Sequence, residues 1–106
     1  MKVYNKLVRD NIPDLILKDN ELPVTRTLSD EEYYEELNKK LMEEVNEYLE
    51  ENNTEEMVDI LEVIRAILEY KGVSFEDIEE KRIKKAKKRG SFNKKVYLEK
   101  VIQNGD

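Results

Sequence analysis

Hydrophobic residues recur along the middle of the chain at the spacing of helical turns. Between residues 30 and 51 they fall at intervals of three and four and form one apolar stripe: Tyr34, Leu37, Leu41, Val45 and Tyr48. Between residues 55 and 70 they cover most of a helical circumference: Met57, Val58, Ile60, Leu61, Val63, Ile64, Ile67 and Leu68. The first pattern predicts an amphipathic helix, and the second predicts a helix buried among several neighbours. In a chain this short, we expect some neighbours to belong to another subunit.

Capping residues indicate where the helices begin and end. Ser29 followed by Glu32 fits a capping box, so the first long helix should begin near Asp30. Similar polar starts and glycine stops predict two further helices, one from about Glu55 to the region of Gly72 and one over 75–89. The short link around residues 51–53 makes the first two long helices an antiparallel hairpin.

The two ends of the chain have weaker signals. Pro13 is tolerated only in the first turn of a helix, so we expect a short helix from about Asn11 to Lys18. Residues 22–28 should be extended, and residues 94–102 fit either a short strand or a final helical turn. The predicted fold is therefore all-α: an antiparallel helical hairpin with flanking helices, forming an oligomeric helical bundle with a short extended segment near each end. The length predicts a single domain over residues 1–106.

Composition excludes several kinds of chemistry. The 106 residues include no cysteine and no histidine, so disulfides, Ser-His or Cys-His nucleophiles and the usual zinc ligand sets are ruled out. Any metal must be held by oxygen. The 25 acidic and 19 basic residues are unevenly placed, because residues 31–69 carry a net charge of −11 and residues 70–106 carry +5. Nothing resembles a signal peptide or a membrane span, which predicts a soluble, cytoplasmic protein that does not contact membranes.

Four carboxylates on the predicted hairpin share a matched spacing. Glu44 and Glu47 are three residues apart, as are Glu56 and Asp59, and in an antiparallel hairpin their numbers pair at a constant sum of 103. The four should converge between the helices, whereas Glu43 is expected to point nearly opposite. With no lysine partner expected nearby, each pair at about 5 Å would repel by roughly 3 kcal/mol at an effective dielectric near 20. A hard divalent cation such as Mg²⁺ would relieve that repulsion. The alternative is that these residues are ordinary solvent-facing glutamates.

The sequence also resembles a known family. The motif of residues 43–47 and 56–59, together with the segments at residues 4–13 and 82–92, resembles the MazG-like all-α nucleoside triphosphate pyrophosphatases, in the phosphoribosyl-ATP pyrophosphohydrolase-like branch. The resemblance implies a homodimer or homotetramer that hydrolyses a nucleoside triphosphate or related nucleotide between its α and β phosphates. It also implies Mg²⁺, with Mn²⁺ as an alternative, and a catalytic set of Glu43, Glu44 and Glu47. The implied metal ligands are Glu44, Glu47, Glu56 and Asp59. The interval between Glu47 and Glu56 is shorter than in the family, which affects how a base would be enclosed.

Basic residues supply candidate phosphate ligands. A helical wheel places Arg82 and Arg89 on the apolar face of the third long helix with Lys85 nearby, where they would bind triphosphate oxygens or, alternatively, pair with the acidic hairpin. The N-terminal candidates for substrate binding are Asn5, Lys6 and Arg9.

Two other functions compete with the enzyme. A non-catalytic module could bind nucleic acid through residues 81–95, which carry nine basic and no acidic side chains. The net charge of −6 and the lack of a recognisable nucleic-acid-reading motif disfavour it. A purely structural dimeric hairpin is the other alternative. Neither one requires carboxylates in matched register.

Overall fold

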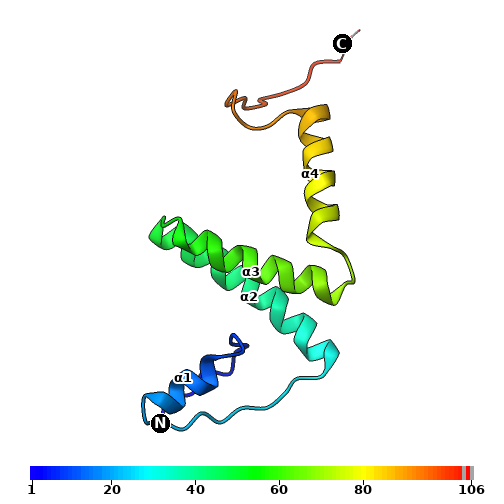
Figure 1. Ribbon diagram of the computed structural model, residues 1–106. Helices are drawn as coiled ribbons and strands as arrows, with labels where there is room; N and C mark the ends of the chain where they lie inside the picture. The colour runs from blue at the N-terminus through cyan, green and yellow to red at the C-terminus, as the bar shows by residue number, and fades with distance from the viewer. Residues whose placement is uncertain (104, 106) are drawn as a thin grey trace. The chain divides into compact units, whose positions relative to one another are not determined.

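The computed structural model describes residues 1–103 and 105, and these residues form four α-helices and no strand (Figure 1). The helices are α1 (Ile12–Lys18), α2 (Asp30–Glu51), α3 (Glu55–Tyr70) and α4 (Phe75–Arg89). The all-α prediction is confirmed, and the helices begin within a residue of the predicted positions. The chain divides into two compact units, Met1–Val73 and Ser74–Asp106, and each is described by itself.

Side-chain caps fix the helix starts as the sequence suggests. The Ser29 hydroxyl accepts a hydrogen bond from the Glu32 amide at 3.3 Å, and the Glu32 carboxylate accepts one from the Ser29 amide at 3.2 Å. This reciprocal capping box satisfies two amides that the helix itself leaves unpaired. At α4, Ser74 accepts from the Asp77 amide at 3.1 Å. At α3 the side chain of Asn53, not that of Thr54, accepts from the first helical amide.

The antiparallel hairpin of α2 and α3 is the centre of the first unit (Figure 1). It is joined by a three-residue link in which Asn52 adopts a left-handed backbone conformation, with φ of 52°. At the far end, Tyr34 stacks on Tyr70 with ring centroids 5.0 Å apart, and Tyr33 meets the edge of the same ring at 6.1 Å. Tyr33 and Tyr70 sum to 103, so these aromatic contacts support the register predicted for the carboxylates.

The hydrophobic core of the described chain is small. Leu37 on α2 is 3% exposed and Val63 on α3 is 8% exposed, and they are its buried hydrophobic residues. Met57, Val58 and Leu61 on α3 remain exposed in this single chain, although the sequence pattern predicted burial on most sides. Within the first unit nothing further covers these side chains, and the oligomer stays a prediction.

Of the two non-helical segments considered from the sequence, the first is as expected and the second is not. Residues 22–28 lack helical structure, in agreement with the predicted extended segment. Residues 94–102 form neither the strand nor the helical turn considered from the sequence, and their apolar side chains are exposed. The physical reason is that the described chain offers this segment no partner strand, and backbone groups of an isolated strand stay unpaired. Within the described part of the chain, no helix combines the length and the hydrophobicity needed to cross a bilayer.

Candidate metal centre

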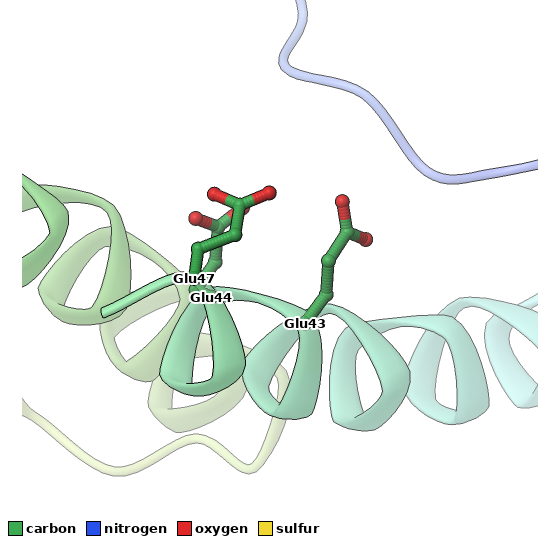
Figure 2. A group of neighbouring side chains, drawn as sticks. All are labelled: Glu43, Glu44 and Glu47. Atoms are coloured by element: carbon green, nitrogen blue, oxygen red, sulfur yellow. The ribbon is translucent and has the colours of Figure 1, made fainter. Parts of the chain in front are cut away.

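Five carboxylates of α2 and α3 form two overlapping groups. Glu43, Glu44 and Glu47 each offer an oxygen within 4.8 Å of the others, and Glu44, Glu56 and Asp59 do the same. Figure 2 shows the first group, whose three side chains project to the same side of α2. Glu44 belongs to both groups and therefore lies at the centre of the cluster. We call these five residues the carboxylate cluster.

Helix periodicity and hairpin register together build this cluster. Glu44 and Glu47 lie three residues apart on α2, and Glu56 and Asp59 lie three apart on α3, so each pair shares one side of its helix. The antiparallel packing then brings Glu44 beside Asp59 and Glu56. Glu47 is close enough to Glu56 to raise its pKa. The structure therefore brings Glu44, Glu56 and Asp59 together, and Glu47 joins them through the group that it shares with Glu44.

The expectation for Glu43 was wrong. Its carboxylate lies with those of Glu44 and Glu47 instead of pointing nearly opposite (Figure 2). The reason is helical geometry, because Glu43 and Glu47 are four residues apart and positions i and i+4 are neighbours on a helix surface. Two lysine ammonium groups lie 3.6 Å from its Oε1 atom, those of Lys6 and Lys40.

Glu44 is buried without full compensation. Its residue is only 6% exposed, and its Oε2 atom has no hydrogen-bond partner; Glu56 Oε2 is also buried and unpartnered. Burial raises the pKa of Glu44, and the negative charges of Glu47 and Asp59 raise it further. Burial and the neighbouring Glu51 and Glu47 raise the pKa of Glu56 to about 7. Both raised pKa values mean that these two carboxylates bind a proton more readily than solvent-exposed glutamates do.

Three cations partly neutralise the cluster. Lys40 Nζ lies 3.6 Å from Glu43 and from Glu44, Lys6 Nζ lies 3.6 Å from Glu43, and Arg9 Nη2 lies 2.6 Å from Asp59 Oδ1. The expectation that no lysine lies near the cluster is therefore wrong, and the spacing of Lys40, three and four residues before Glu43 and Glu44, was a usable signal for these ion pairs. Five carboxylates against three cations leave an excess of two negative charges when all are ionised.

The donor set suits a hard divalent cation. All five groups offer carboxylate oxygens, the ligand type that Mg²⁺ and Mn²⁺ take in proteins. Two buried oxygens lack partners, and a polar group left unpaired in a protein interior is costly. The two surplus negative charges match the charge of one such ion. The residues that could hold it are those predicted from the sequence: Glu44, Glu47, Glu56 and Asp59.

The predicted substrate-binding residues occupy two different units. Lys6 and Arg9 contact the carboxylate cluster, whereas Asn5 is exposed, with a left-handed φ of 47°. Arg82, Lys85 and Arg89 are exposed on α4, in the second unit, so their joint action with the cluster stays a prediction. Arg82 donates to Glu79 of its own helix at 3.0 and 3.1 Å, where an ion pair with the acidic hairpin was the alternative considered.

Comparison with known proteins adds one partial relative. A stretch of 42 residues is 57% identical to an uncharacterized protein of Mycolicibacterium smegmatis, covering 40% of this chain and 43% of that protein. The match therefore spans less than half of the length of either protein. No family model matches the chain, and no solved structure matches it.

Proposed function

We propose that this chain is a Mg²⁺-dependent nucleoside triphosphate pyrophosphohydrolase, which cleaves between the α and β phosphates and releases a nucleoside monophosphate and pyrophosphate. The observation that carries this proposal is Glu44. It is a buried carboxylate with an unpartnered oxygen, placed where two groups of three carboxylates overlap. The resemblance of residues 43–47 and 56–59 to the MazG-like signature supports the same activity.

A structural role alone does not account for the cluster. Glutamates that serve only solubility gain nothing from burial or from facing one another, since both raise the free energy of their charged forms. Here one group is nearly inaccessible and two have raised pKa values. A cation bound among these carboxylates would offset the repulsion between them, which accounts for their crowding.

The proposed chemistry divides roles among the residues. A divalent cation bound there would supply positive charge to offset the charge on phosphate oxygens and to polarise a water molecule. Glu44, Glu47, Glu56 and Asp59 would hold the ion, and Glu43, at the edge of the cluster, would accept the proton that the attacking water loses. The water oxygen forms a bond to a phosphorus atom, and the bond from that phosphorus to the oxygen bridging the α and β phosphates breaks. The bridging oxygen leaves with the other product. Lys6, Arg9, Arg82, Lys85 and Arg89 offset the charge of the substrate.

One assay tests the proposal directly. The protein is incubated with a panel of nucleoside triphosphates, with Mg²⁺ or with EDTA, and pyrophosphate is resolved from orthophosphate. We expect pyrophosphate in equal amount to nucleoside monophosphate, and only with Mg²⁺. Orthophosphate as the sole product would contradict the assigned bond. Retention of nucleic acid without turnover would favour the basic module of residues 81–95 instead.

We further propose that the active form contains at least two copies of the chain. Val58 and Leu61 leave apolar surface exposed on α3, and the chain buries few hydrophobic side chains by itself. Covering that surface with the same helix of a second copy would enlarge the core, as small domains commonly require. Sedimentation at micromolar concentration should show a dimer or tetramer. A folded monomer there would overturn this part of the proposal.

A further inference from the structure

The non-helical segment before α1 contacts both helices of the carboxylate cluster. Within residues 4–11, Lys6 lies 3.6 Å from Glu43 on α2, and Arg9 donates a 2.6 Å hydrogen bond to Asp59 on α3. The two basic residues are three positions apart, and together they reach carboxylates on both sides of the hairpin. Residues 4–11 have no helix or strand to hold them. We call them the N-terminal strap.

The strap occupies part of the site that a cation would use. Asp59 belongs to the group of three carboxylates that includes the buried Glu44, and its Oδ1 atom already accepts from the Arg9 guanidinium. A guanidinium and a divalent cation repel each other at such short range. Arg9 therefore neutralises the very carboxylate that the ion needs.

We propose that Arg9 and a divalent cation compete for Asp59, so that the N-terminal strap closes over the cluster without metal and is released when metal binds. This inference rests on the proposed function, because it takes the cluster as the metal site. Once released, the Arg9 guanidinium is free to bind an anion, and the triphosphate of the proposed substrate is the anion that arrives with the metal. Metal binding and phosphate binding are thereby coupled through one side chain.

The exposure of the pair makes such displacement feasible. The side chains of Arg9 and Asp59 are 53% and 41% exposed, and ion pairs accessible to water are weak. Loss of the competing pair should therefore tighten metal binding only modestly, by about two- to fivefold. A strong, buried pair would instead exclude the ion altogether.

A calorimetric titration with Mg²⁺ alone tests the competition in three proteins. These are the parent, Arg9→Gln and Arg26→Gln. Arg26 is a matched control, because its guanidinium pairs with Glu32 at 2.8 Å, outside the carboxylate cluster. We expect Arg9→Gln to bind Mg²⁺ about two- to fivefold more tightly and Arg26→Gln to equal the parent. Unchanged or weaker binding by Arg9→Gln would overturn the proposal, since Arg9 would then be neutral or would help to orient Asp59.

Release of the strap has a second readout that needs no variant. Trypsin must take an arginine side chain into its own pocket, so an Arg9 held by Asp59 is a poor cleavage site. Mg²⁺ should speed cleavage after Arg9 severalfold while cleavage after Arg26, in the same sample, stays constant. Equal rates after Arg9 with Mg²⁺ and with EDTA would refute release.

Turnover measured on the same proteins separates this inference from the proposed function. If Arg9 competes with Mg²⁺ but no pyrophosphate is released, the proposal for the strap stands and the proposed function is refuted. If pyrophosphate is released but the parent and Arg9→Gln bind Mg²⁺ equally well, the proposed function stands and the proposal for the strap is refuted. Absence of Mg²⁺ binding in all three proteins would refute both.

Discussion

Carboxylates on the α2–α3 hairpin and on α4 have opposite electrostatic surroundings. On the hairpin, burial and neighbouring acids raise the pKa values of Glu44 and Glu56. On α4, the hydrogen-bonded Arg82 guanidinium lowers the pKa of Glu79, and Glu80 lies 3.5 Å from Lys84. Glu79 and Glu80 of α4 thus pair with basic residues of their own helix, while carboxylates of the hairpin meet like charges across two helices.

The difference shows that the spacing of charged residues along one helix does not by itself decide whether they form ion pairs or a cluster of like charge. Both regions contain acidic residues with another charged residue three or four positions away, and on α4 this spacing produces ordinary i,i+3 and i,i+4 ion pairs. On the hairpin the same spacing is combined with a partner helix in register, and the result is a cluster with surplus negative charge. The proposed cation would offset that surplus charge on the hairpin, whereas α4 would have no need of one.

The largest effect is expected from the centre of the cluster. Glu44→Gln keeps the size of the side chain but removes a charged ligand, so Mg²⁺-dependent pyrophosphate release should fall by at least about 100-fold. Glu50→Gln, an exposed position on the same helix, is the matched control and should retain activity. Pyrophosphate release measured under saturating Mg²⁺ checks both. Equal activity in the two variants would show that Glu44 is merely a buried polar residue.

Mg²⁺ itself should stabilise the first unit. An ion that binds only the folded state adds about 2.7 kcal/mol to the free energy of unfolding at a hundredfold excess over its dissociation constant. Urea unfolding with Mg²⁺ and with EDTA measures this gain. KCl at matched ionic strength is the control, because screening of surface charges would stabilise the chain without specific binding. If KCl reproduces the gain, the hairpin behaves like α4 and has no ion site.

Substitution of Arg89 tests whether α4 takes part in the activity proposed for the carboxylate cluster of α2 and α3. Arg89→Ala should lower kcat/KM about tenfold through the loss of a charged hydrogen bond to phosphate, while Mg²⁺ affinity stays unchanged. Lys88→Ala, its exposed neighbour on α4, should have little effect. Turnover and calorimetry on both variants supply the comparison. A parallel loss of folding stability and activity would indicate instead that Arg89 has a structural ion pair.

The sequence was sufficient for the helices because their signals are local. The Ser29–Glu32 capping box and the glycines after α3 and α4 act within one helical turn, so their positions could be read directly. The register of Glu44 with Asp59 was also predictable, because a three-residue link leaves the hairpin little freedom. The contact between Arg9 and Asp59 was not, since it joins residues 50 positions apart through a segment without periodicity. Burial of Glu44 depends on side-chain packing, which no pattern of residues encodes.

The pH dependence of stability should separate the two regions. In EDTA, Glu56 has a folded pKa of about 7 against an ordinary value of 4.5, so the folded state binds its proton more tightly. Its stabilisation is present below pH 4.5 and is lost as the pH rises to 7. The stability of Glu56→Gln relative to the parent should therefore increase over this range. Glu79→Gln should show no such increase, because the lowered pKa of Glu79 gives a contribution that is lost as pH falls below 4.5. Urea midpoints across pH 4.5–7.5 measure the difference, and a flat response of Glu56→Gln would contradict it.

The smallest effect concerns Glu47, which shares an edge of the cluster with Glu43 and Glu44. Glu47→Gln removes one negative charge from a crowded site and keeps its shape, so the protein in EDTA should become more stable by about 1 kcal/mol after solvent screening. Glu50→Gln should change stability by less, because Glu50 lies outside the cluster. The gain from Mg²⁺ should shrink in Glu47→Gln, since a ligand has been lost. A variant that is more stable without metal and less responsive to it is difficult to explain by a solvent-facing glutamate, which would leave both measurements unchanged.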